Sequence, residues 1–107
     1  MRKAVWLSFD LGVKGDYESL YAWLDAHDAH ECGDSTAFFE YETDGILPDE
    51  IKNSLKEAID VDAKTRIYIV YKDDKKVKGR FLFGRRKSPP WSGYAPKETA
   101  DTLDEDK

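Results

Sequence analysis

The sequence predicts an α+β fold in which two helices cover one face of an antiparallel sheet. Segments rich in β-branched and aromatic residues alternate with two segments whose apolar residues recur at helical spacing. The chain has 107 residues, of which 40% are hydrophobic and 36% charged, so it is long enough to bury one core. We therefore expect a single small globular domain.

The first half of the chain is predicted to contain three strands and one helix. Residues 3–10 alternate between two faces and form the first strand. Asp16 is a suitable N-cap for a helix through about residue 28, whose apolar residues recur at three- and four-residue intervals. A brief strand at 29–33 is expected to turn into an aromatic-rich strand at 35–43.

The second half is predicted to contain one helix and two strands. Pro48 suits the first turn of a helix whose apolar stripe ends at Ile59. The run 66–71, RIYIVY, is nearly continuous in β-branched and aromatic residues, as expected of a central strand. Residues 72–76 form a charged turn, and residues 77–84 form the last strand.

The element order predicts a ferredoxin-like domain over residues 1–87. It is βαββαβ followed by an additional C-terminal strand. Regular structure should end beyond Arg85, because Ser88-Pro89-Pro90 cannot continue a sheet. Residues 88–107 form an irregular proline and aromatic tail, whose Trp91 and Tyr94 either clamp a partner or simply pin the tail. We expect the acidic end, residues 99–107, to be disordered.

Both faces of the predicted sheet carry apolar side chains. The face expected to lie away from the helices contains Trp6, Ser8, Phe38, Tyr68, Val70 and Leu82. Monomers rarely expose large contiguous apolar patches, so we expect a second copy to cover this face in a homodimer. The alternative is that the tail folds back and covers it with Trp91 and Tyr94.

The net charge of −5 conceals a basic segment. Residues 72–87 contain eight basic side chains against two acidic ones: Lys72, Lys75, Lys76, Lys78, Arg80, Arg85, Arg86 and Lys87. This pattern indicates either a solvated hairpin with lysines that protect an edge strand, or a patch that binds nucleic acid or a protein partner. The stretch 78–84, KGRFLFG, is similar to the aromatic strand of RNA-recognition motifs, but it follows the second helix instead of preceding it.

Two groups of residues are candidates for metal chemistry. Asp10 ends the first strand, where a carboxylate either ligates a metal or anchors the following loop. In a dimer two Asp10 side chains could together hold Mg²⁺ and assist phosphodiester hydrolysis. The second group is His27, His30, Glu31, Cys32 and Asp34. It has suitable ligands for a transition metal, but the spacing matches no established zinc pattern. The favoured alternative is two histidines near a helix C-terminus and a small buried cysteine in a strand.

The composition also bears on the compartment. A lone cysteine, Cys32, makes no internal disulfide, which favours a reducing cytoplasm. Arg2 and Lys3 lead directly into a strand, so we expect no signal peptide. No apolar run approaches the roughly 18 residues of a membrane helix.

Several short motifs resemble a known group of proteins. The first strand ends in SFDLG, the first helix carries LYAWL, and DSTAFFEYE and RIYIVY form later strands. This order resembles the small CRISPR-associated endonucleases of the adaptation machinery and the related virulence-associated D-type toxins. The resemblance implies that Asp10 is a metal ligand at a dimer cleft and that Ser35 matches the family's serine. It also implies that Val77–Gly84 completes the partner's sheet.

Residues 12–18 depart from the family pattern, because they are nearly devoid of the arginines and lysines that meet nucleic acid there. We therefore expect a small dimeric protein that acts mainly as a binding or assembly module, without a certain cofactor. The alternative is a Mg²⁺-dependent endonuclease that cuts RNA or DNA through Asp10.

Overall fold

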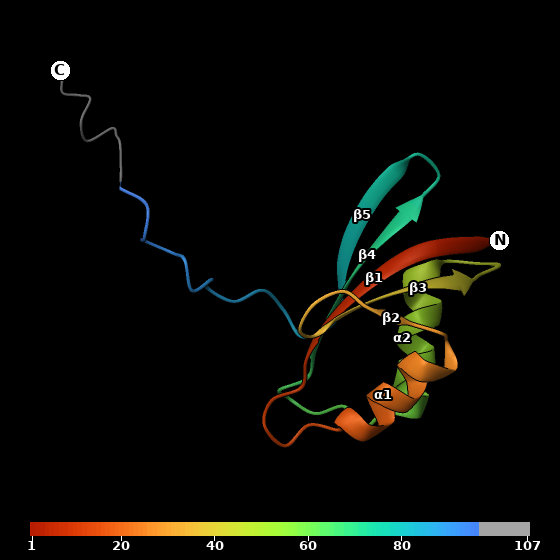
Figure 1. The fold of residues 1–107 in the computed structure, drawn as a ribbon, viewed down its shortest axis with the longest axis horizontal. Helices are drawn as coiled ribbons and strands as arrows, with labels where there is room; N and C mark the ends of the chain where they lie inside the picture. Colours follow the sequence, from red (N-terminus) through yellow and green to blue (C-terminus); the bar gives the residue numbers. More distant parts are fainter. Residues whose placement is uncertain (97–107) are drawn as a thin grey trace.

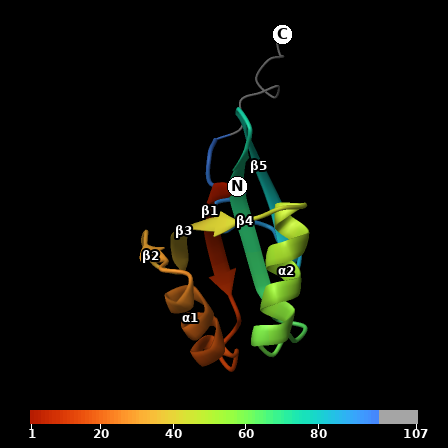
Figure 2. The same ribbon diagram turned by 90° about the vertical axis from the view of Figure 1, so that its right-hand side faces the viewer.

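The computed structural model describes residues 1–96, so the predicted disorder of residues 99–107 lies outside the described part. It confirms the α+β class, with two helices and a five-stranded antiparallel sheet (Figure 1). In chain order the elements are β1 (Arg2–Asp10), α1 (Tyr17–Ala26), β2 (His30–Glu31), β3 (Thr36–Glu42), α2 (Leu47–Ala58), β4 (Arg66–Asp73) and β5 (Lys76–Phe83). Both helices lie on the same face of the sheet (Figure 2).

The strands are arranged in the order β2-β3-β1-β4-β5, with β1 at the centre. Most strand ends lie within one or two residues of the predicted ones, but the turn after β4 is shorter than expected. The strands pair as far as Asp73 and Lys76, which leaves only Asp74 and Lys75 in the turn. Asp74 adopts a φ of 60°, because tight two-residue hairpin turns require positive φ.

The core lies between the sheet and the two helices. Val5, Leu7 and Phe9 share the helix-facing side of β1, and the first two are completely buried. The N-cap prediction for α1 is confirmed, since the Asp16 carboxylate accepts a hydrogen bond from the Ser19 amide at 3.2 Å. The helices are joined by a further polar contact: the Trp23 indole Nε1 donates to Ser54 Oγ at 2.9 Å.

A β-bulge near the end of β5 places two successive residues on the core side of the sheet. Ile67 pairs with Phe83, but Tyr68 pairs with Phe81, so Leu82 is the extra residue. Leu82 is only 3% exposed and belongs to the hydrophobic core. The prediction that it lies on the open face is therefore wrong: the register counted from the hairpin turn puts Phe81 on the open side and Leu82 in the core, and the bulge then keeps Phe83 on the core side as well. Phe81 takes its place on that face beside Tyr68.

The segment after β5 does not cover the open face. Residues 84–96 contain no helix or strand, and they lead away from the domain on the side opposite the helices (Figure 1). Trp91 is 71% exposed and Tyr94 is 84% exposed, so the interpretation that they fold back over the sheet is wrong. Within residues 1–96, no helix or strand packs over the face that the helices leave open.

The last strand completes the edge of its own sheet. β5 pairs with β4 from Ile67 and Phe83 to Asp73 and Lys76. The resemblance to the endonuclease and toxin group implied that this strand completes a partner's sheet. In the structure its inner edge is already occupied by β4, which leaves only the outer edge for another chain.

Candidate nucleic-acid interface

Asp10 anchors the loop that follows β1. One carboxylate oxygen accepts a hydrogen bond from the Gly12 amide at 3.0 Å. The Tyr17 hydroxyl accepts from the Leu11 amide at 3.2 Å and donates to the Gly12 carbonyl at 2.8 Å. These contacts hold the turn between β1 and α1 in one conformation, and they leave the Asp10 side chain exposed at the end of the strand.

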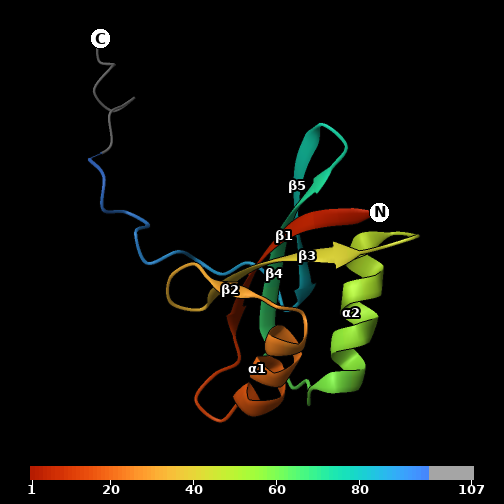
Figure 3. The same cartoon turned by 45° about the vertical axis from the view of Figure 1, so that its right-hand side comes forward.

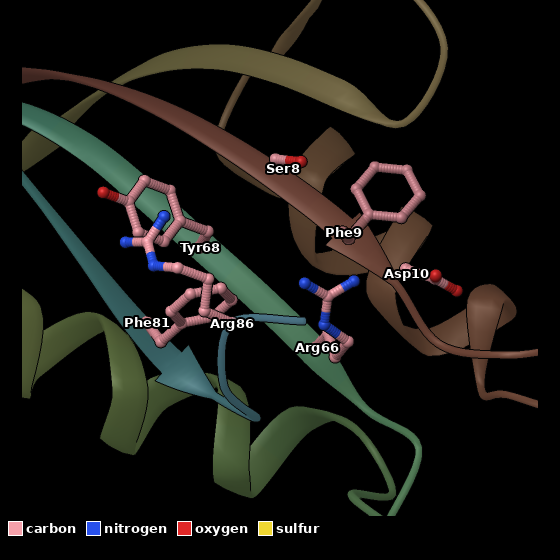
Figure 4. Close-up of a pocket in the computed structure, with 7 residues that line it drawn as sticks. All are labelled: Ser8, Phe9, Asp10, Arg66, Tyr68, Phe81 and Arg86. Atoms are coloured by element: carbon pink, nitrogen blue, oxygen red, sulfur yellow. The ribbon is translucent and has the colours of Figure 1, made fainter. Parts of the chain in front are cut away.

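Three adjoining hollows share Asp10 and Arg66. The first, of about 290 Å³, lies on the open face of the sheet (Figure 4) and is lined by Ser8, Phe9, Asp10, Arg66, Tyr68, Phe81 and Arg86. The second, of about 520 Å³, continues past the strand ends along Lys64, Arg85 and Lys87. The third, of about 500 Å³, follows the start of the tail as far as Trp91. Because all three share these two residues, they form one extended depression.

Five cationic side chains surround this depression, which we call the basic groove: Lys64, Arg66, Arg85, Arg86 and Lys87. Among residues 1–96, Asp10 is the only acidic residue that lines it. None of the five cations takes part in an ion pair within residues 1–96. The groove therefore carries a local excess of uncompensated positive charge in a chain of net charge −5.

Two of the arginines contact the same aromatic ring. The Arg66 guanidinium lies 5.6 Å from the centre of the Phe81 ring, and the Arg86 guanidinium lies 5.7 Å from it. Arg66 is further oriented because its Nε donates to the Arg85 carbonyl at 3.2 Å. In Figure 4 both side chains extend over the open face of β4. Their stacking leaves guanidinium N–H groups available to an anion.

The basic segment predicted from the sequence is divided between two ends of the sheet. Arg85, Arg86 and Lys87 lie at the groove, whereas the others follow the β4–β5 hairpin away from it (Figure 3). Those others are Lys72, Lys75, Lys76, Lys78 and Arg80. Two of them are neutralised locally. Lys78 binds Asp73 at 2.8 Å, and Arg80 lies 3.7 Å from Asp49. Hydrogen bonds from Lys78 and then Lys3 lower the pKa of Asp73.

Sequence reasoning missed Lys64 and Arg66 as groove residues. Both precede the basic segment, in the loop before β4 and at its first position. The signal that points to them is the hairpin itself: in an antiparallel pair the start of β4 must lie beside the end of β5. Arg66 is thereby brought next to Arg85, whose carbonyl it contacts.

The open face next to the groove carries an aromatic surface, which we call the aromatic face: Trp6, Phe38, Tyr68 and Phe81. The rings form two pairs, with centres 5.0 Å apart for Trp6 and Phe38 and 4.8 Å apart for Tyr68 and Phe81. Trp6 is 38% exposed and the others are half-buried. Gly79 permits this arrangement, because a Cβ there would lie 2.1 Å from the Tyr68 hydroxyl oxygen.

Ser35 lies at the same end of the sheet as Asp10 but does not line the groove. It occupies the turn before β3 with a φ of 63°. Its backbone carbonyl accepts a hydrogen bond from the Phe9 amide at 3.0 Å. In this structure Ser35 therefore contributes its backbone to strand pairing.

The residues of the second candidate metal group have separate roles. His27 stacks on Trp23 with ring centres 3.9 Å apart, and Glu31 accepts from the Gly33 amide at 2.7 Å. Cys32 is exposed, so the interpretation of it as a buried strand residue is wrong; it follows β2, a two-residue strand at the sheet edge. Over residues 1–96 no three His, Cys, Asp or Glu side chains gather as a metal-binding set.

Comparisons with protein-family models, curated proteins and solved structures found no match to this chain. In the part of the chain that the structure describes, neither helix has the length and apolar character needed to cross a membrane.

Proposed function

We propose that this protein is a nucleic-acid-binding module that holds a phosphate backbone in the basic groove. The observation that carries the proposal is the convergence of five unpaired cations on one depression with a single carboxylate. Protein cations that neutralise phosphates release condensed counterions, and this release drives non-specific binding to nucleic acid. Arg66 and Arg86 add bidentate donors, which suit phosphate oxygens.

The length of the groove favours a polymer over a small anion. Its cations come from two separate segments, 64–66 and 85–87, and they are distributed over three adjoining hollows. A single phosphate contacts only one or two arginines at a time. A chain of phosphates can engage all five cations, so the charge distribution fits a polyanion better than an isolated ion.

The architecture also supports a binding role. We propose that the sheet is ferredoxin-like, and the antiparallel order β2-β3-β1-β4 supports this assignment, with β5 added at the edge. In such an arrangement the helices occupy one face and the other is available for a ligand. Here that available face adjoins the groove through Arg66, Tyr68 and Phe81.

The test is the salt dependence of binding to a fluorescein-labelled 20-nucleotide strand, measured by fluorescence anisotropy. Five phosphate contacts predict a slope of about −3.5 in log K against log salt, which is roughly a hundredfold loss between 50 and 200 mM. The variant Arg66→Ala/Arg86→Ala should flatten this slope by about 1.4. The matched control Lys75→Ala/Lys76→Ala removes the same charge at the hairpin turn and should leave the slope unchanged.

Two results would contradict the proposal. Equal losses in the groove variant and in the hairpin control would mean that only the overall charge matters. An absence of binding at 20 mM salt, for both DNA and RNA, would remove nucleic acid as the ligand and favour a protein partner.

The second candidate is the Mg²⁺-dependent endonuclease, because Asp10 lies where the backbone would pass. Within residues 1–96 of one protomer the groove does not fit a magnesium site, since Asp10 is the only carboxylate that this part of the chain places there and cations surround it. A homodimer in which two Asp10 side chains converge would have to supply the second carboxylate. Cleavage of RNA or DNA that requires Mg²⁺ and is lost in Asp10→Ala, together with a dimer in sedimentation, would support this candidate. Binding without cleavage would reject it.

A further inference from the structure

We propose that the nucleic acid is single-stranded, with its bases stacked on the aromatic face and its phosphates in the basic groove. This inference rests on the proposed function and adds the class of nucleic acid and the way its bases are held. Base stacking on exposed rings is typical of proteins that bind single strands, because every base has a π-face.

The strand register places the two aromatic pairs side by side. Trp6 pairs with Phe38 on one side and Val70 on the other, while Ser8 pairs with Tyr68. Tyr68 is therefore one strand across and two positions along from Trp6. Strand spacings of about 4.8 Å and a two-residue advance of about 6.8 Å separate these positions by roughly 8 Å.

That separation distinguishes an open strand from a duplex. Neighbouring bases in a duplex are stacked on each other at a spacing of about 3.4 Å, so their faces are already covered. The two aromatic positions on the sheet are more than twice that distance apart, so duplex bases cannot stack on both. An unstacked strand can place one base on Tyr68 and Phe81 and another on Trp6 and Phe38.

The hollow beside the Tyr68–Phe81 pair provides space for a base. Ser8 has a small side chain and lies beside Tyr68, within the hollow of about 290 Å³ on the open face. This volume is near the lower end of the range for small-ligand pockets, about 300 to 1,000 Å³. Figure 4 shows Tyr68, Phe81 and the two arginines around the same surface, with Ser8 on the neighbouring strand.

The position of the cations determines at which end of the aromatic face the phosphates of the strand lie. The cations lie at one end of the aromatic face, near Asp10, and Arg86 is in the irregular segment just after β5. The Arg86 side chain is exposed, so it can leave the Phe81 ring for a phosphate or remain and stack on a bound base. Either contact joins the basic groove to the aromatic face through a single nucleotide.

The experiment compares four proteins on a labelled 20-nucleotide strand and on a duplex of the same sequence, by anisotropy at low salt. The proteins are the parent, Tyr68→Leu, Trp6→Leu and the control Tyr21→Leu, which removes an aromatic side chain that is 54% exposed on α1. Circular dichroism and thermal unfolding show that each variant is folded, and Phe81→Leu replaces any that is not.

The parent should bind the single strand at least tenfold more tightly than the duplex. Tyr68→Leu and Trp6→Leu should each weaken single-strand binding by about fivefold or more, while duplex binding and the Tyr21→Leu control change less than twofold. If Arg66→Ala/Arg86→Ala weakens binding but the face variants do not, the groove function stands and the stacking inference is overturned. Tighter duplex binding, or a dimer that the face variants dissociate, would also overturn it.

Discussion

Replacing Leu82 and Phe81 separately by alanine measures which of the two is in the core. Leu82 is 3% exposed and packs in the core, so Leu82→Ala removes buried methyl groups and leaves a cavity. Such substitutions cost about 2–5 kcal/mol, and we expect about 3 kcal/mol here. For a domain of this size, each kcal/mol lowers Tm by roughly 4–8 °C.

Phe81→Ala should cost less, although phenylalanine is the larger side chain. Its ring is half-buried, and its specific contacts are Tyr68 and the two guanidinium groups. An aromatic pair contributes about 0.5–1.5 kcal/mol and each exposed cation–π contact about 0.5–1 kcal/mol. We therefore expect a loss of about 2 kcal/mol, below the roughly 3–5 kcal/mol of a core phenylalanine.

The assay is urea unfolding followed by tryptophan fluorescence, with the slope m compared between variants. A β5 register shifted by one residue makes the opposite prediction, because it would put Phe81 in the core and Leu82 on the open face. A loss above 3 kcal/mol for Phe81→Ala together with less than 1 kcal/mol for Leu82→Ala would refute the pairing of Phe81 with Tyr68 and the assignment of the aromatic face.

Three further predictions concern single contacts. Ser54→Ala leaves the Trp23 indole N–H, in a side chain only 6% exposed, without its partner, and should lower the free energy of unfolding by about 1–3 kcal/mol in the same urea assay. Gly84→Ala should lower Tm and weaken nucleic-acid binding, because φ is +80° and a Cβ would lie 2.8 Å from the Thr65 carbonyl oxygen; an unchanged Tm would contradict this. Asp73 has its pKa lowered by Lys78, so its stabilising contribution is present above about pH 4 and is lost as the pH falls below its usual pKa. Asp73→Asn should therefore lower Tm at pH 7, with the difference from the parent shrinking below about pH 4.

Most of the fold follows from local sequence patterns. The alternation in residues 3–10 predicted β1, Asp16 predicted the start of α1, and Pro48 predicted the first turn of α2. These signals work because each depends on a few neighbouring residues. The turn at Asp74 was predicted to be longer than it is. The charged residues on either side of it were assigned to the turn, but they form the ends of two exposed strands.

The candidate site was less predictable, because it depends on contacts between segments. Counting charges along the chain treated residues 72–87 as one basic segment. In the structure β5 runs through the middle of this segment, so the two ends of the segment lie at opposite ends of the strand. Arg66 is separated from Arg85 by a whole hairpin, and only the pairing of β4 with β5 brings them together. Asp10 was recognised as a candidate from its place at the end of a strand. The cations around it could not be predicted in the same way, because they come from other segments of the chain.

The pairing register of β5 with β4 is the feature that joins the aromatic face to the basic groove. Counted from the hairpin turn, this register places Phe81 opposite Tyr68 on the open side and the next residue, Leu82, in the core. A register shifted by one residue would exchange these faces and place an aliphatic side chain beside Tyr68, and the guanidinium groups of Arg66 and Arg86 would have no ring to stack on. The bulge acts one residue later, where it keeps Phe83 in the core beside Leu82. The register set by the hairpin turn, which alternation alone does not reveal, therefore creates the surface on which cations and aromatic rings meet.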